Sequence, residues 1–157
     1  MNLSRRALGG LASALVLAGL AGCTPQARPV IAVGSVDGRP TAYTVSCADT
    51  KVDRVRVEEV AGDRAVAQWH ARTDTAAGPE RITLLQDPDG WTVPTRTLTE
   101  FRPGRQYVVF ATAHGDDAGT VYFTVEQVAG LGAGQVLVKR GQVVSEQDFR
   151  EAARKAC

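Results

Sequence analysis

The chain has 157 residues, of which 44% are hydrophobic and 6% aromatic, and its 18 basic residues nearly balance 17 acidic ones. This length is sufficient for one domain with a hydrophobic core. The balanced charge leaves no basic stripe, so composition excludes a nucleic-acid-binding protein of the usual electrostatic kind.

The N-terminal segment combines a positive start with a short apolar run. Arg5 and Arg6 precede residues 7–21, in which Ser13 is the only polar side chain. About 20 apolar residues are needed to cross a bilayer as a helix, and this run is shorter. The pattern is typical of a removable signal peptide over residues 1–22, with a permanent membrane helix as the alternative.

The end of this segment reads Leu20-Ala21-Gly22-Cys23. It resembles the lipobox of bacterial lipoproteins, in which two small residues precede the cysteine that becomes lipidated. The resemblance implies that Cys23 carries a diacylglycerol and anchors the protein to membrane lipid on the outer, extracytoplasmic face of the cell membrane. Two acyl chains are enough for stable anchoring.

The export route has two readings. Ser4-Arg5-Arg6-Ala7-Leu8 resembles a twin-arginine signal, although Gly9 and Gly10 stand where a lysine often follows. The general secretory route is the alternative.

The mature chain is predicted to have a short tether and one domain. Residues 23–29 form a lipidated, proline-containing tether, and residues 30–157 form the domain. Six extended residues reach about 20 Å, so the domain is expected to stay close to the bilayer.

Alternating apolar and polar residues predict a mainly β domain. Tyr107, Val109 and Ala111 share one face of a strand, and Val108 and Phe110 share the other. Turn-forming Asp, Gly and Pro residues separate the strands, as expected for a sandwich-like or barrel-like domain. The predicted strands are 30–36, 41–48, 52–60, 64–71, 81–86, 95–100, 106–113, 120–126 and 135–140.

The segment Phe101-Arg102-Pro103-Gly104-Arg105-Gln106-Tyr107 precedes and enters one of these strands. It resembles the start of strand F in immunoglobulin-like and fibronectin type III domains, where a tyrosine hydroxyl bonds to backbone a few residues upstream. The resemblance implies a sandwich, with Trp69 as the candidate for the core tryptophan of that family.

A helix is predicted over 145–157, docked on the sheet. Ser145 can cap its start, and Phe149 and Ala153 lie on its apolar face. Cys47 is in phase with Tyr43 and Val45 on a predicted inner strand face. Since Cys23 is assigned to lipid, Cys47 and Cys157 remain as a pair, and an exported protein favours a disulfide between them. A reactive thiol pair or a metal site is the alternative.

Few residues suggest catalytic or metal chemistry. His114, Asp116 and Asp117 could ligate a divalent ion, although a polar hairpin loop kept soluble by charge is the favoured interpretation. Asp87-Pro88-Asp89-Gly90 lacks the further carboxylates of a calcium loop and reads as a turn. No nucleophile has an evident base, and no cofactor motif is present.

Trp91 and Tyr122 are the candidate binding residues, since Trp91 adjoins a turn and Tyr122 opposes the inner face of its strand. The sequence therefore predicts a noncatalytic, membrane-anchored protein-interaction module whose partner is another envelope protein. A small-ligand or metal-binding lipoprotein is the alternative, and an enzyme is the third reading.

Overall fold

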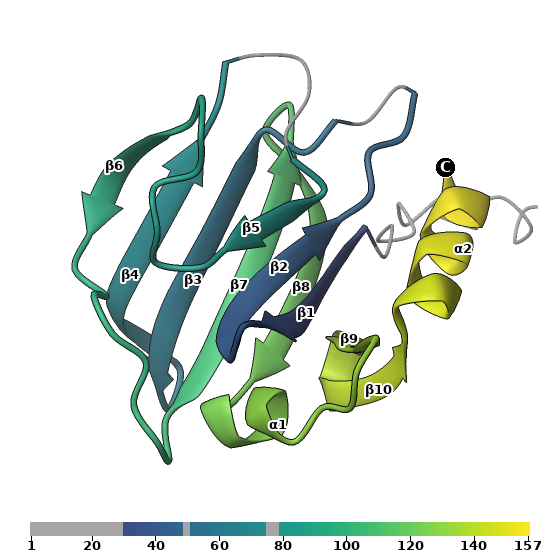
Figure 1. The fold of residues 1–157 in the computed structure, drawn as a ribbon. Helices are drawn as coiled ribbons and strands as arrows, with labels where there is room; N and C mark the ends of the chain where they lie inside the picture. The colour runs from purple at the N-terminus through teal and green to yellow at the C-terminus, as the bar shows by residue number, and fades with distance from the viewer. Residues whose placement is uncertain (1–29, 49–50, 75–78) are drawn as a thin grey trace, which may run out of the picture.

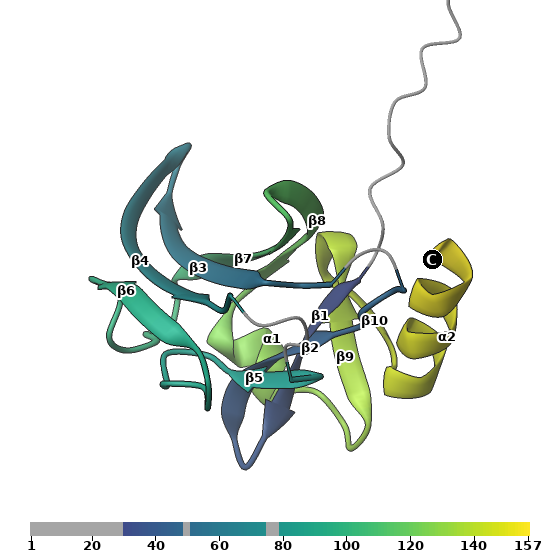
Figure 2. The ribbon, with the colours of Figure 1, turned by 90° about the horizontal axis from the view of Figure 1, so that it is seen from above.

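The computed structural model describes residues 30–48, 51–74 and 79–157, which form two facing five-stranded antiparallel sheets (Figures 1 and 2). Sheet 1 consists, in spatial order, of β10 (Gln142–Ser145), β9 (Gln135–Val138), β1 (Ile31–Val36), β2 (Arg39–Thr44) and β5 (Arg81–Thr83). Sheet 2 consists of β6 (Thr92–Arg96), β4 (Arg64–Arg72), β3 (Arg54–Ala61), β7 (Gln106–Ala113) and β8 (Asp116–Phe123). The predicted mainly β, sandwich-like architecture is confirmed.

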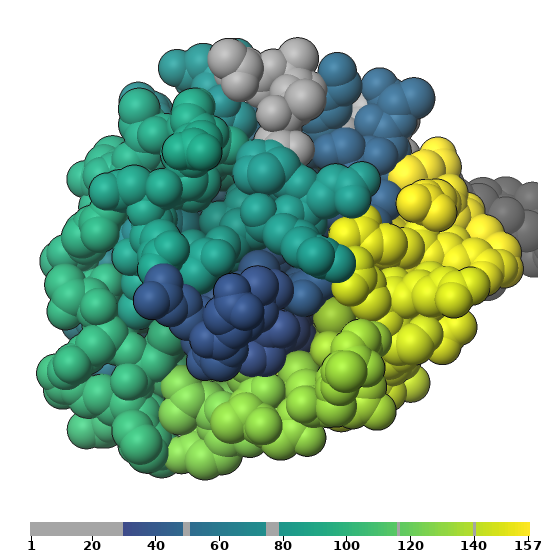
Figure 3. Space-filling view, in the orientation of Figure 1, coloured from purple at the N-terminus to yellow at the C-terminus, as the bar shows by residue number. Residues whose placement is uncertain are grey.

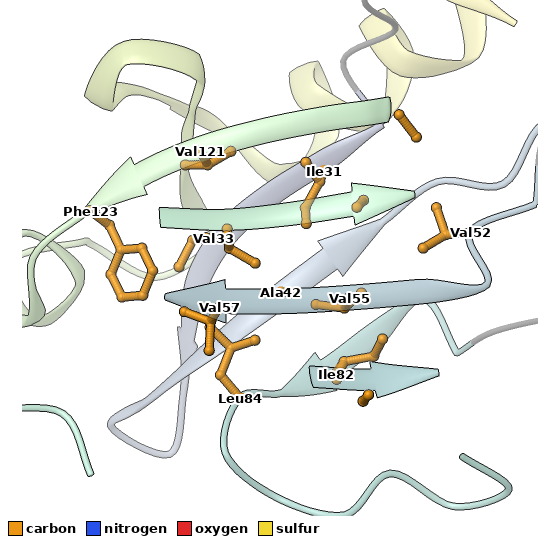
Figure 4. Close-up of a cluster of buried hydrophobic side chains, with 14 of the residues drawn as sticks. Ile31, Val33, Ala42, Val52, Val55, Val57, Ile82, Leu84, Val121 and Phe123 are labelled. Carbon is orange, nitrogen blue, oxygen red and sulfur yellow. The ribbon is translucent and has the colours of Figure 1, made fainter. Parts of the chain in front are cut away.

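The core lies between the two sheets. Val55 and Val57 of β3 point toward Ile31 and Val33 of β1, and all four are nearly inaccessible to solvent (Figure 4). Successive side chains on a strand point to opposite faces, so only alternate residues of sheet 2 reach this core. The other half of each strand of sheet 2 forms its outer face.

Two hairpins depend on left-handed backbone at their tips. His114 and Gly115 connect β7 to β8 with φ angles of 53° and 91°, and Asp37 and Gly38 connect β1 to β2 with 51° and 75°. Two-residue loops with positive φ at both positions match the twist of antiparallel strands. These turns fix the register of both hairpins.

The hydrogen bond expected at Tyr107 is present. Its hydroxyl accepts the backbone N–H of Arg102 at 2.7 Å, and its ring meets the Phe101 ring edge-on at 4.8 Å between centroids. Burial raises the pKa of this hydroxyl, and the Arg102 backbone bond opposes that effect. The contact holds the loop before β7 against the end of the core.

The predicted strand over 120–126 is wrong beyond Phe123. Thr124 caps helix α1 (Val125–Ala129) through a capping box with Gln127, and Val128 packs into the core. The glycine-rich segment 130–134 therefore joins a helix to β9, and does not join two strands as the predicted strands 120–126 and 135–140 would require. A short 3-10 turn, η1 (Lys139–Gly141), and β10 then follow β9.

The C-terminal helix α2 (Glu146–Ala156) agrees with the predicted helix. The Ser145 hydroxyl accepts the N–H of Asp148 at 3.0 Å, as expected for a capping residue. Phe149 and Ala153 pack against Tyr43 and Val45 on the face of sheet 1 away from sheet 2. Tyr43 and Val45 thus lie under α2 and not between the sheets, which corrects the inner face predicted for them.

A disulfide joins Cys47, just beyond β2, to Cys157 at the end of α2. The two Cα atoms are 5.3 Å apart, and Cys47 is buried. The predicted pairing is confirmed, and it attaches α2 covalently to the sheet.

Ion pairs hold the other end of α2 to the edge strand β5. Arg81 donates to both carboxylate oxygens of Glu146, at 2.9 and 3.0 Å, and Arg150 donates to Glu146 at 2.9 Å. Arg150 also pairs with Glu80 at 3.0 Å. The yellow surface of α2 meets the teal surface around β5 in Figure 3, consistent with these contacts.

Replacing Glu146 with glutamine should lower the free energy of unfolding by about 1 kcal/mol at pH 7. Burial raises the pKa of Glu146, but hydrogen bonds from Arg81 and Arg150 outweigh burial and hold it below the ordinary 4.5. A depressed pKa stabilises the fold above the unfolded-state value, and this stability is lost as the pH falls through the folded-state value.

The measurement is urea unfolding of wild type and Glu146→Gln at neutral and strongly acidic pH. The difference between them should shrink as the pH falls below 4.5. Glu151→Gln is the control, because the partner of Glu151 among the described residues is the exposed Lys155, and the substitution should change stability little. A pH-independent difference for Glu146→Gln would contradict the assignment.

Candidate interaction surface

The two predicted binding residues lie at opposite edges of sheet 2. Trp91 precedes edge strand β6, packs partly against the core and donates its backbone N–H to Pro88 at 3.0 Å. Tyr122 lies on edge strand β8, with 47% of its surface exposed. Tyr122 is exposed on the outer face, whereas Trp91 is partly buried at the other edge, so the structure does not bring the pair together.

The residues predicted to bind a metal lie in the β7–β8 hairpin. The backbone N–H of His114 donates to Asp53 at 2.9 Å, and the Asp117 carboxylate accepts the N–H of Gly119 at 2.9 Å. The side chain of Asp116 is not among those that the structure describes. Among the described residues, no three His, Cys, Asp or Glu side chains are grouped closely enough to hold a metal ion.

The outer face of sheet 2 carries a group of basic side chains on its central strand β3 and on the neighbouring strand β4. Arg54 lies directly opposite Arg72 across the β3–β4 pair, and Arg56 lies opposite His70. All four point away from the core, because Val55, Val57, Trp69 and Ala71 fill the alternate, inward positions. We call this set the basic quartet: Arg54, Arg56, His70 and Arg72.

Within the described part of the chain, the quartet is poorly compensated by carboxylates. Arg56 Nε lies 3.1 Å from a Glu58 oxygen, whereas neither Arg54 nor Arg72 forms an ion pair with any described residue. The buried Nε of Arg54 and the buried Nε2 of His70 have no hydrogen-bond partner there. Buried polar atoms without partners are costly, and a bound ligand can satisfy them.

The surroundings of His70 lower the pKa of its imidazole. Burial lowers its pKa, and the positive charges of Arg54, Arg56 and Arg72 lower it further. The imidazole is therefore mainly neutral at pH 7, and one of its ring nitrogens is available as an acceptor.

An apolar strip lies beside the basic quartet on β7 and β8. Its members are Val108, Phe110 and Tyr122, with Val108 directly opposite Tyr122 across the strand pair. The Arg56 guanidinium lies 4.7 Å from the centre of the Phe110 ring, so it joins the quartet to the strip. Val108 is nearly fully buried although it belongs to neither core cluster. Its neighbours on this outer face must therefore cover it.

The two faces of the sandwich differ in what covers them. Helix α2 packs on the outer face of sheet 1, whereas neither helix of the described residues lies over β3 and β4 of sheet 2 in Figure 2. Arg72 and Tyr122 are exposed on that second face, and the Arg56 side chain keeps 44% of its surface accessible. The outer face of sheet 2 is the candidate interaction surface.

Sequence reasoning missed the basic quartet. The alternation of Arg54 and Arg56 with Val55 and Val57 shows that both arginines point outward, but it does not show what stands beside them. That depends on the β3–β4 register, which includes a bulge opposite Glu59 and Val60.

In the described residues, no helix has the length and apolarity needed to cross a bilayer. Comparisons of the chain with protein-family models, with curated proteins and with solved structures gave no match.

Proposed function

We propose that this protein is a noncatalytic lipoprotein of the bacterial envelope, held to the membrane by lipid on Cys23, that binds another protein through the outer face of sheet 2. The observation that carries the binding role is the exposed Tyr122 on the same sheet face as the basic quartet, in which Arg54 and Arg72 have no ion-pair partner among the described residues. Tyrosine and arginine are among the residues enriched where proteins bind one another.

Two features support an exported, anchored protein. The Leu20-Ala21-Gly22-Cys23 sequence carries the lipobox resemblance, although it lies outside the described residues. The Cys47–Cys157 disulfide fits an oxidising compartment outside the cytoplasm.

The position of the tether would leave the interaction surface accessible. Ile31 pairs with Thr44 at the end of sheet 1 from which the chain enters the domain, and the Val30 carbonyl accepts the N–H of Val45. A tether of about 20 Å would keep this end near the bilayer. With the strand ends toward the bilayer, the outer face of sheet 2 would lie at the side of the domain and would not face the membrane. A neighbouring envelope protein could then reach it.

Replacing Cys23 with serine should move the protein from the membrane fraction to the soluble fraction and abolish labelling by a radioactive fatty acid. The serine hydroxyl cannot replace the thiol as acceptor of the diacylglycerol. Cell fractionation and lipid labelling measure both effects, with Thr24→Ser as the neighbouring control. Unchanged labelling of Cys23→Ser would rule out the anchor.

The binding role is tested by a photo-crosslinking amino acid placed at Tyr122 or, as the control, at Arg39 on sheet 1. On intact cells, position 122 should give a discrete crosslinked protein that is absent from position 39. That product should weaken when Cys23→Ser is added, because the domain is then released from the membrane. Equal products from both positions, or none from position 122, would refute this surface.

A further inference from the structure

The arginines of the basic quartet repel one another, and a bound anion would reduce this repulsion. Like charges directly opposite each other across a strand pair are destabilising, and Arg54 faces Arg72 in this way. Glu58 is the carboxylate paired with the quartet among the described residues, and it contacts Arg56. The quartet therefore has two arginines to offer to an incoming anion.

The composition of the surface favours a protein as the source of that anion. Its cations are all arginine, whose planar guanidinium bonds carboxylates through two parallel hydrogen bonds. Phe110 and Tyr122 stand on the same face, so a charged side chain and an apolar one could be bound together. Such pairing of arginine with aromatic residues is typical of protein interfaces.

The loops at the tether end argue against an anionic lipid surface. Asp53, Asp74 and Asp117 lie at this end, beside the tip of the β7–β8 hairpin, and Asp74 and Asp117 are exposed. Figure 1 shows the C-terminal ends of β2, β4 and β7 directed toward that end of the molecule. The exposed carboxylates of Asp74 and Asp117 would meet an acidic bilayer before the basic quartet and would be repelled by it.

We infer that the outer face of sheet 2 binds an acidic segment of the partner protein, with its carboxylates on Arg54 and Arg72 and an adjacent apolar side chain on Phe110 and Tyr122. This inference rests on the proposed function and adds the chemistry of the partner.

The test measures binding of synthetic peptides to the full chain carrying Cys23→Ser, so that it does not depend on anchoring. One ten-residue peptide contains glutamates on both sides of two central leucines. The control peptide has the same sequence with every glutamate replaced by glutamine. The glutamate peptide should bind and the glutamine peptide should not. Arg54→Gln and Arg72→Gln should each weaken binding about tenfold, since each removes charged hydrogen bonds. Tyr122→Ser should weaken it severalfold.

Arg39→Gln is the matched control, because it removes the same charge from sheet 1 and should leave the affinity unchanged. Increasing the salt concentration should weaken binding of the glutamate peptide. Vesicles of phosphatidylglycerol test the lipid surface as an alternative ligand.

A nuclear magnetic resonance titration of the two histidines, His70 and His114, adds a readout that fold damage would not mimic. The charged groups facing His70 are Arg54 and Arg56 on β3, Arg72 on β4 and Glu58 diagonally across, while β6 presents Thr95. Peptide carboxylates on the arginines should raise the pKa of His70 relative to the free protein. By linkage, the peptide should then bind more tightly as the pH falls.

Several results would overturn the inference: equal binding of both peptides, no loss with Arg54→Gln and Arg72→Gln, the same loss with Arg39→Gln, or an unchanged His70 pKa. Binding to phosphatidylglycerol vesicles but not to the glutamate peptide would assign the surface to lipid. A crosslink at Tyr122 in cells combined with no peptide binding would refute the acidic segment and leave the proposed function standing.

Discussion

Replacing Cys47 and Cys157 together with alanine should lower the free energy of unfolding by about 4–5 kcal/mol. The bridge closes a loop with a sequence separation of 110, and in the chain-entropy model a loop of this length restricts the unfolded chain by that amount. Alanine is preferred to serine because Cys47 is buried, and a hydroxyl there would add a desolvation cost of its own. Urea unfolding followed by far-ultraviolet circular dichroism measures the change.

The loss should be uneven along the chain. Only Phe149 and Ala153 of α2 are fully buried, so the noncovalent contacts of this helix with sheet 1 are few. In contrast, β3 is flanked by β4 and β7 in the middle of sheet 2. Without the bridge, amide hydrogen exchange should accelerate in α2 more than in β3, because elements with few buried contacts open locally first.

Ser46→Ala is the control, because it changes the residue next to Cys47 and keeps the bridge. Reduction of the wild-type protein should reproduce the behaviour of the double alanine variant. A stability loss below about 1 kcal/mol would contradict the loop-entropy account. Equal acceleration of exchange in α2 and β3 would contradict the dependence of helix docking on the disulfide.

What could be predicted from the sequence was local. The outward positions of Val108 and Phe110 follow from the period of a single strand, and the cap at Ser145 follows from the residues beside it. Helix α1 was missed although Thr124 and Gln127 form a capping box. Apolar alternation continues through Val125, so the periodicity of β8 concealed the start of the helix.

The basic quartet could not be predicted because it belongs to a pairing between strands. Arg54 meets Arg72 only in the register set by the β3–β4 hairpin, and Arg56 meets Phe110 only through the β3–β7 pair, which joins distant parts of the chain. A shift of one residue would turn every side chain of a strand to the other face. The location of an interaction surface on a sheet therefore depends on register, which composition and periodicity leave open.

Replacing Trp69 with alanine should lower the free energy of unfolding by about 3–5 kcal/mol. Trp69 is fully buried in the core, on β4 between β3 and β6, and truncation of a large aromatic side chain leaves a cavity that its neighbours fill only in part. Circular dichroism is the suitable probe, because the chain has two tryptophans and each variant removes one fluorophore.

Trp69→Phe should lower the free energy of unfolding much less than Trp69→Ala does, by about 1 kcal/mol. The indole Nε1–H of Trp69 is buried without an acceptor among the described residues, and phenylalanine removes this unsatisfied donor while keeping a ring. Trp91→Ala is the matched tryptophan control, with an expected loss of about 1–2 kcal/mol because Trp91 is only partly buried. A loss at Trp91 equal to that at Trp69 would contradict this distinction.

The two substitutions at Trp69 should also differ in binding. Trp69 points inward on β4, and its neighbour His70 points outward within the basic quartet, so the core side chain supports the strand beneath the interaction surface. Trp69→Phe should retain the affinity for the glutamate peptide. Trp69→Ala should weaken it even under conditions where the variant remains folded, because a cavity beneath β4 lets Arg72 and His70 move relative to Arg54 and Arg56. Equal affinities of both folded variants would show that the quartet is positioned by strand pairing alone.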